Sequence, residues 1–202
     1  MEQELHTIKR TDETDDILLA ALKLFAEQGY FNTSLTDIAK AAGLTTVSSI
    51  YQSFNNKQAI AIKLNDMIFD SLNVSIDDIR RRNQKASEQL RSFVNLLFKL
   101  TDEAPNIMRF LLVMQTSEFI PQQKPLLETP AFTKVVKIMQ AGIRAGEIRN
   151  IDPLLATGFF LGVINNTLRM VLSGELEKNA DAYQPQAWLA AWNLIAKKST
   201  CF

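Results

Sequence analysis

Apolar residues recur along this chain at intervals of three and four positions, which is the spacing of one face of an α-helix. Near the N-terminus, the residues that follow this spacing are Ile17, Leu18, Ala21, Leu24 and Phe25. The acidic residues just before them suit the first turns of a helix, because the helix dipole favours negative charge there. Short alternating strands bounded by turn residues are absent from the sequence, so the pattern predicts an all-α protein of about nine helices.

Glycine, proline and capping residues mark where the predicted helices begin and end. Gly29, Gly43 and Gly146 stop apolar stripes, whereas Pro130 and Pro153 each follow a capping residue at the start of one. The expected helices span about 12–28, 57–82, 87–103, 106–119, 130–145, 153–173 and 185–198, with two short helices between the first two and one clear loop over 120–129.

Composition limits the classes of protein that fit this chain. The hydrophobic share of 47% is enough for one sizeable core, or for a small domain fused to a larger one. Basic and acidic residues both number 22, so the formal net charge is zero and gives no support for strong nucleic-acid binding. The one cysteine, Cys201, excludes a disulfide within the chain and favours a reducing compartment. The polar N-terminus has no secretory signal and no stretch looks apolar enough to span a bilayer, so we expect a soluble, cytoplasmic protein with no membrane partner.

A short helix, a glycine turn and a second short helix follow the first long helix. Ser34 is a good N-cap, and Asp37 three residues later suits a capping box. Gly43 ends the first short helix, and Thr45 or Thr46 is expected to cap the second. This is the layout of a helix-turn-helix, whose second helix enters the major groove of DNA, although plain structural corners have the same layout.

Four runs of residues around this motif carry a resemblance to a known family. They are Ile17-Leu-Leu-Ala-Ala-Leu-Lys-Leu-Phe25, Glu27-Gln-Gly29-Tyr-Phe-Asn-Thr33, Ile38-Ala-Lys-Ala-Ala-Gly43-Leu44 and Ile50-Tyr51-Gln-Ser-Phe54-Asn-Asn-Lys57. In this order they resemble the DNA-binding domain of the TetR family over about residues 15–64.

The resemblance implies a three-helix, helix-turn-helix DNA-binding domain over residues 1–58 and a helical ligand-sensing and dimerisation domain over residues 59–202. It also implies a homodimeric transcription regulator of the repressor kind. Such a protein would bind a palindromic double-stranded DNA operator, and a small, apolar effector would release it.

Two departures from the family pattern affect the expected DNA contacts. The spacing from Gly43 to Tyr51 is one residue longer than usual, and the second helix carries no arginine or lysine. Because glutamine bonds adenine and threonine methyls contact thymine methyls, we predict an operator that contains A·T pairs. Lys57 and the hydroxyl of Tyr51 are expected to meet phosphates. The predicted DNA-contacting residues are Ser34, Thr36, Thr45, Thr46, Ser48, Ser49, Tyr51, Gln52 and Lys57.

The charge of the DNA-binding segment bears on how it would bind. Residues 1–66 contain six basic and nine acidic residues, a net charge of −3. Since few cations are available to neutralise phosphates, we predict a shallow dependence of DNA affinity on salt.

The rest of the chain contains more large apolar residues than a DNA-binding domain needs. A helical bundle of this kind can hold an apolar pocket, although an ordinary core needs the same residues. Asn166 and Arg169 share one helix face, which is expected in a pocket, at a dimer seam or in solvent, with the seam or surface favoured. Gly158-x-x-x-Gly162 and the broad apolar surface of the last helix support dimerisation. The candidate pocket residues are Phe69, Phe93, Leu97, Phe110, Met114, Phe159, Asn166, Arg169 and Met170.

Two other classes of protein compete with a regulator. An enzyme has no positive support, because His6 is the only histidine and no Cys-His pair, zinc-ligand set or glycine-rich phosphate loop is present. We therefore expect no catalytic residues, no metal and no cofactor. The second alternative is a helical interaction or sensor protein of the same fold that does not bind DNA, which the acidic N-terminal segment and the longer turn would suit.

Overall fold

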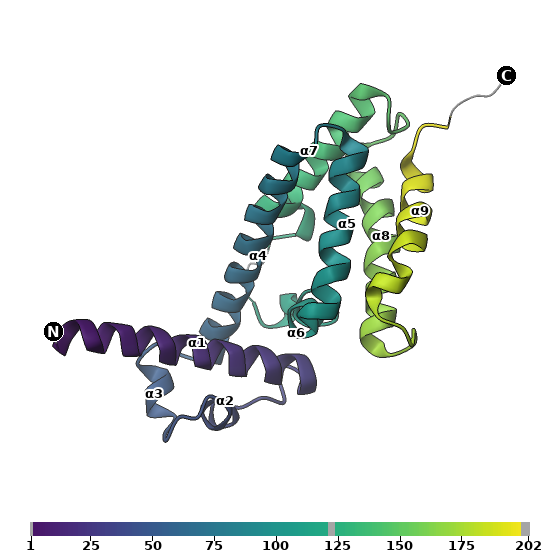
Figure 1. The fold of residues 1–202 in the computed structure, drawn as a ribbon. Coiled ribbons are helices and arrows are strands. Elements are labelled where there is room, and N and C mark those ends of the chain that lie inside the picture. The colour runs from purple at the N-terminus through teal and green to yellow at the C-terminus, as the bar shows by residue number, and fades with distance from the viewer. Residues whose placement is uncertain (1, 121–123, 199–202) are drawn as a thin grey trace. The chain divides into compact units, whose positions relative to one another are not determined.

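The computed structural model describes residues 2–120 and 124–198, and helices are the main regular structure of these residues (Figure 1). The predicted all-α fold is confirmed, with nine α-helices in the described part of the chain. They are α1 (Glu2–Gln28), α2 (Leu35–Ala41), α3 (Ser48–Tyr51), α4 (Lys57–Arg82), α5 (Ala86–Glu103), α6 (Pro105–Leu112), α7 (Pro130–Ala145), α8 (Pro153–Ser173) and α9 (Gln184–Ile195). Short 3-10 helices cover Thr116–Glu118, Leu126–Glu128 and Ala180–Tyr183.

Three helix ends differ from those predicted. α1 begins at Glu2 rather than near residue 12, because no glycine or proline interrupts the chain before Gly29. α6 ends at Leu112, and the turn that follows lets Phe119 and its neighbour Ile120 become buried. α9 ends at Ile195, where the chain instead pairs with residues 147–149: the Arg149 amide donates to the Ile195 carbonyl at 2.9 Å.

The chain divides into two compact units. The N-terminal unit comprises residues 2–68 and 109–120, and the C-terminal unit comprises 69–108 and 124–198. Nothing in the sequence indicated that residues 109–120 belong with the N-terminal unit. The core of the N-terminal unit is built from Ile17, Ala21, Phe25, Ile38, Ile50 and Ile60 among others, and that of the C-terminal unit from Leu90, Val94, Val135, Phe160, Ile164 and Leu168 among others.

The corner that joins α7 to the next helix is tightly built within the C-terminal unit. A Cβ added at Gly142 would lie 2.7 Å from Cδ1 of Ile148 and 2.9 Å from Cβ of Ala86, so the contact there needs glycine. Gly146 ends α7 in the left-handed conformation, with a φ of 74°. The carboxylate of Glu147 then accepts hydrogen bonds from the amides of Ala86 and Ser87, at 3.0 and 3.1 Å, and from the Ser87 hydroxyl.

Glu147 should make the stability of this unit depend on pH. Partial burial tends to raise the pKa of its carboxyl, but the hydrogen bonds from Ser87 and Ala86 outweigh it, so the pKa lies below the ordinary glutamate value. A carboxyl with a lowered pKa in the folded state stabilises the fold above the pKa of the unfolded chain and loses that contribution as the pH falls through the folded pKa. We expect the Glu147→Gln variant to melt a few degrees below the native protein at pH 7, and the difference between the two melting temperatures to shrink as the pH falls below the ordinary glutamate pKa of about 4.3.

Thermal unfolding between pH 3 and 7 checks this prediction. The exposed Glu128, replaced by glutamine, serves as the control and should follow the native curve throughout. A difference in melting temperature between the native protein and Glu147→Gln that stays constant across the pH range would show that the charge of Glu147 does not contribute to stability.

α8 is more apolar than we predicted from the sequence. It has 21 residues and an 18-residue window of mean hydropathy 1.3, so by length and composition it could cross a membrane, which corrects the expectation that no stretch could. Only 33% of that window is buried. Its inner side packs on α7 and α9, and its outer side is left open in the protomer.

Candidate functional site

The helix-turn-helix begins with a well-capped α2. The amide of Asp37 donates to the Ser34 hydroxyl oxygen at 3.1 Å, and the Ser34 amide donates to the Asp37 carboxylate at 2.9 Å. The Ser34 hydroxyl also donates to the Asp37 carboxylate, at 2.6 Å, and the hydrogen bonds from the Ser34 hydroxyl and amide hold the pKa of Asp37 below its usual value. Gly43, with a φ of 71°, then turns the chain out of α2. The capping box predicted from the spacing of Ser34 and Asp37 is confirmed.

The second helix of the motif begins later than we predicted. The helix has Val47 at its N-cap and begins at Ser48, so neither Thr45 nor Thr46 caps it, contrary to our prediction. Bonds of the 3-10 kind run from the Ser49 amide to the Thr46 carbonyl and from the Ile50 amide to the Val47 carbonyl, at 3.3 and 3.0 Å. The recognition element is therefore a tight turn followed by a four-residue helix.

One side of this element is anchored and the other is open. Ile50 and Phe54 are buried in the N-terminal unit, and the Thr14 and Ser53 hydroxyls lie 3.1 Å apart, which ties α1 to the residues after α3. The open side carries polar side chains and no charge. Its exposed members are Thr45, Thr46, Ser48, Tyr51 and Gln52, with Ser49 half-buried beside them.

The other predicted DNA-contacting residues have different surroundings. Ser34 and Thr36 are exposed at the start of α2, but the Ser34 hydroxyl also lies 2.6 Å from the Asp37 carboxylate. Lys57 is half-buried, and its ammonium donates to the carbonyls of Tyr30 and Thr33 at 2.7 and 2.6 Å. Burial lowers the pKa of Lys57.

Lys57 thus closes the loop between α1 and α2 onto the start of α4, which favours a structural role over the phosphate contact that we predicted. The sequence could not reveal this, because the carbonyls that Lys57 meets lie 24 and 27 positions earlier in the chain.

The structural role of Lys57 can be tested with the Lys57→Met variant, which keeps the apolar part of the side chain and removes the ammonium. The Thr33 carbonyl then loses its donor, so we expect the melting temperature of Lys57→Met to fall by about 2–6 °C and DNA affinity to fall with it. The salt dependence of binding should not change, whereas loss of a phosphate contact would reduce its slope by about 0.9. Lys63→Met, which removes an exposed lysine of α4, is the control and should keep the native melting temperature.

Aromatic side chains hold residues 109–120 within the N-terminal unit. The ring of Tyr30 stacks on that of Phe119, with centroids 4.0 Å apart, and the Lys57 ammonium lies 4.3 Å from the Tyr30 ring centre. The Gln58 side chain donates to the Phe119 carbonyl at 2.9 Å. Phe110 meets Phe119 edge to face. Sequence analysis missed this cluster, because no periodicity links residues so far apart in the chain.

The candidate pocket residues do not form one group. Phe93 and Leu97 are buried in the C-terminal unit and Phe69 is half-buried there, whereas Phe110 and Met114 belong to the N-terminal unit. The remaining candidates lie on α8, where Met170 is half-buried and Phe159, Asn166 and Arg169 are exposed. Phe159, Asn166 and Arg169 therefore lie on the outer face of α8. This agrees with the expectation that Asn166 and Arg169 lie at a dimer seam or on the surface.

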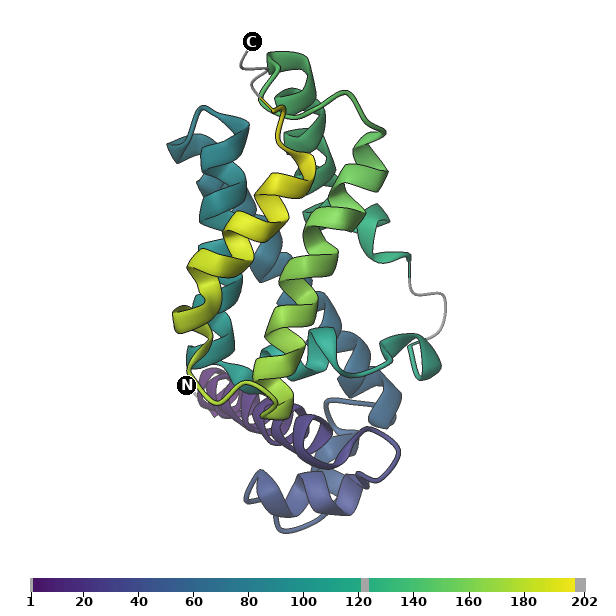
Figure 2. The same cartoon turned by 90° about the vertical axis from the view of Figure 1, so that its right-hand side faces the viewer.

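This outer face of α8 continues onto α9. The two helices lie side by side, and no other helix of the C-terminal unit lies in front of them in Figure 2. Gly158 and Gly162 are open: a Cβ added at either would meet nothing within 4 Å. The exposed apolar side chains here are Leu154, Leu155, Phe159, Leu189 and Leu194, each 41–58% exposed. We call this surface the α8–α9 face.

Known proteins share both the motif and the fold. Residues 17–64 match the family model described as bacterial regulatory proteins, tetR family. The fatty acid metabolism regulator protein of Bacillus subtilis (strain 168) is 27% identical over 155 residues, which cover 75% of this chain and 79% of that protein.

Two solved structures have the same fold as the described chain. A TetR family transcription regulator from Marinobacter aquaeolei VT8 has a TM-score of 0.77 at 22% identity, over 98% of this chain and 100% of that one. The regulator FadR from Bacillus subtilis, in complex with stearoyl-CoA, has a TM-score of 0.68 at 23% identity, over 87% and 96%. The motif match lies on the helix-turn-helix described above, so residues 17–64 form a DNA-binding domain of the tetR family, and the described chain has the fold of TetR family transcription regulators.

Proposed function

We propose that this protein is a homodimeric repressor that reads a palindromic operator through the open side of its helix-turn-helix and leaves it when a long-chain acyl compound binds. The observation that carries the proposal is the recognition element itself. Its polar residues from Thr45 to Gln52 are exposed, while Ile50 and Phe54 anchor the element from behind. Such a surface suits hydrogen bonding to base edges and phosphates.

The effector class is inferred from relatives. The Bacillus subtilis relative is named as a regulator of fatty acid metabolism, and FadR was solved with stearoyl-CoA. In this chain, the C-terminal unit contains an aromatic cluster of Phe69, Phe93 and Phe132, which would suit the apolar part of such a ligand.

The dimer is inferred from the α8–α9 face. Exposed leucines and a phenylalanine on adjoining helices form an apolar surface that a monomer would leave in water. The open positions at Gly158 and Gly162 would let a second copy approach closely. A two-fold dimer would present two recognition elements to half-sites about one helical turn, roughly 34 Å, apart.

Release would follow from a two-state equilibrium. The acyl compound would bind better to one arrangement of the two DNA-binding units and the operator to the other. Coupling of about 1–3 kcal/mol, or 5- to 150-fold in affinity, is typical of such systems.

The test is a selection of binding sites from sheared genomic DNA with purified, ligand-free protein at two salt concentrations. We expect a palindromic site with A·T pairs, a shallow loss of affinity with salt, and release of the site by stearoyl-CoA. No enrichment at low salt would reject DNA binding and leave the interaction protein. An enriched site that stearoyl-CoA fails to release would reject only the effector class.

A further inference from the structure

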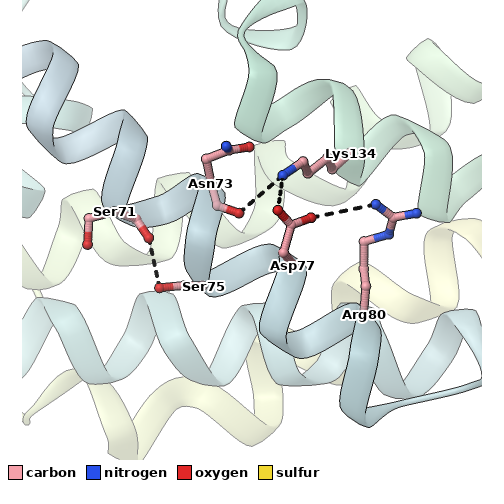
Figure 3. A network of polar contacts seen from close by, with 6 residues as sticks. All are labelled: Ser71, Asn73, Ser75, Asp77, Arg80 and Lys134. Atoms are coloured by element: carbon pink, nitrogen blue, oxygen red, sulfur yellow. Dashed lines mark hydrogen bonds and ion pairs between the residues drawn. The ribbon is translucent and has the colours of Figure 1, made fainter.

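A polar network joins α4 to α7 inside the C-terminal unit (Figure 3). The ammonium of Lys134 on α7 pairs with the carboxylate of Asp77 and also donates to the main-chain carbonyl of Asn73, at 3.4 Å. Asp77 in turn pairs with Arg80 at 3.8 Å. The positive charge of Lys134 is thus already matched by a carboxylate at this point.

One atom of this network is buried without a hydrogen-bond partner. It is Oδ1 of Asn73, and no other buried side-chain nitrogen or oxygen in the described part of the chain lacks a partner. An unpaired buried carbonyl oxygen lowers stability, because it loses its hydrogen bonds to water on folding and gains none within the protein. Most buried polar groups in proteins are paired, so an orphan of this kind calls for an explanation.

The unpaired oxygen and the aromatic cluster belong to the same pair of helices, α4 and α7. Phe69 is one turn before Asn73 on α4, and Phe132 is two residues before Lys134 on α7. The Phe69 and Phe132 ring centres are 6.3 Å apart, and Phe132 also meets Phe93 at 6.1 Å. α4 and α7 are therefore joined both by an aromatic contact and by polar contacts.

We infer that Oδ1 of Asn73 accepts a hydrogen bond from an uncharged N–H or O–H group of the effector, whose apolar chain packs against the aromatic cluster. This inference rests on the proposed function and names the chemistry of its ligand. A carboxylate does not fit, because it would face an oxygen acceptor and the neighbouring ammonium is already paired. A thioester of the pantetheine type fits, since it carries an amide N–H two carbons beyond its sulfur, whereas an ionised fatty acid has no donor.

Asn73→Leu tests the inference, because leucine keeps the shape of the side chain and removes both polar atoms. We expect the ligand-free variant to melt about 2–4 °C above the native protein, as an unpaired buried oxygen is lost. Its affinity for stearoyl-CoA should fall about tenfold, because the donor of the ligand would stay unpaired. Its affinity for stearate, measured in parallel, should change less than twofold. Ser75→Ala, two residues along α4, is the control and should match the native protein in both affinities.

The other outcomes separate the inference from the proposed function. Unchanged stearoyl-CoA affinity in Asn73→Leu would overturn the inference and leave the effector class standing. An equal loss for stearoyl-CoA and stearate would also overturn it, since the loss would then reflect the shape of the site. If the native protein bound neither probe, the effector class and the inference would fail together.

Discussion

The Gly162→Leu variant is expected to be a monomer of about 22.8 kDa that binds the operator at least a hundredfold more weakly than the native protein. A Cβ at position 162 meets nothing within 4 Å in the protomer, so we expect a side chain there to be accommodated within one chain. In the proposed dimer the same leucine would hold apart two helices that approach at Gly158 and Gly162. A monomer binds one half-site only, and loss of the second half-site removes a gain of about 10²–10⁴.

Light scattering after gel filtration and titration of the selected operator measure the two effects. Ala141→Leu places the same side chain at an exposed small residue of α7 and should leave both mass and affinity unchanged. A Gly162→Leu protein that stays dimeric would place the dimer contact elsewhere than the α8–α9 face.

Sequence periodicity predicts most helices here because each has its own stop signals. Gly146 and Gly174 end α7 and α8 in the left-handed conformation, and the Asp152 side chain and Pro153 begin α8, as expected. The ends that differ depend on distant contacts. α9 stops at Ile195 because the chain pairs with residues 147–149, and α6 stops at Leu112 before a turn that buries Phe119. Such contacts leave no local pattern.

In the candidate site, too, local features could be predicted from the sequence and features set by distant contacts could not. The polar, uncharged character of the recognition element is evident from the residues between Thr45 and Gln52 alone. The partners of Lys57 and the unpaired oxygen of Asn73 are set by tertiary structure, and neither residue differs in sequence from an ordinary surface lysine or asparagine. Helical spacing placed Asn166 and Arg169 on one face of α8, but only the fold shows that this face is exposed in the protomer.

We expect the double variant Tyr51→Phe with Gln52→Ala to bind the operator about a hundredfold more weakly than the native protein. It lacks both the Tyr51 hydroxyl and the Gln52 amide. Both side chains are exposed on the recognition element, so neither change should alter the melting temperature. A bidentate amide–adenine pair contributes about 1–3 kcal/mol of discrimination, and a hydroxyl–phosphate hydrogen bond about 1 kcal/mol.

The single variants distinguish the two roles. If Gln52 reads adenine, Gln52→Ala relaxes the preference for one A·T pair in each half-site, whereas Tyr51→Phe weakens all sites alike because a phosphate carries no sequence information. Repeating the site selection with each variant measures this, and Gln140→Ala, at an exposed position of α7, is the control. Since the element carries no arginine or lysine, we expect its specificity to depend on such neutral hydrogen bonds. A selected site with G·C at every contacted position, or one that the double variant binds as tightly as the native protein, would mean that other residues read the operator.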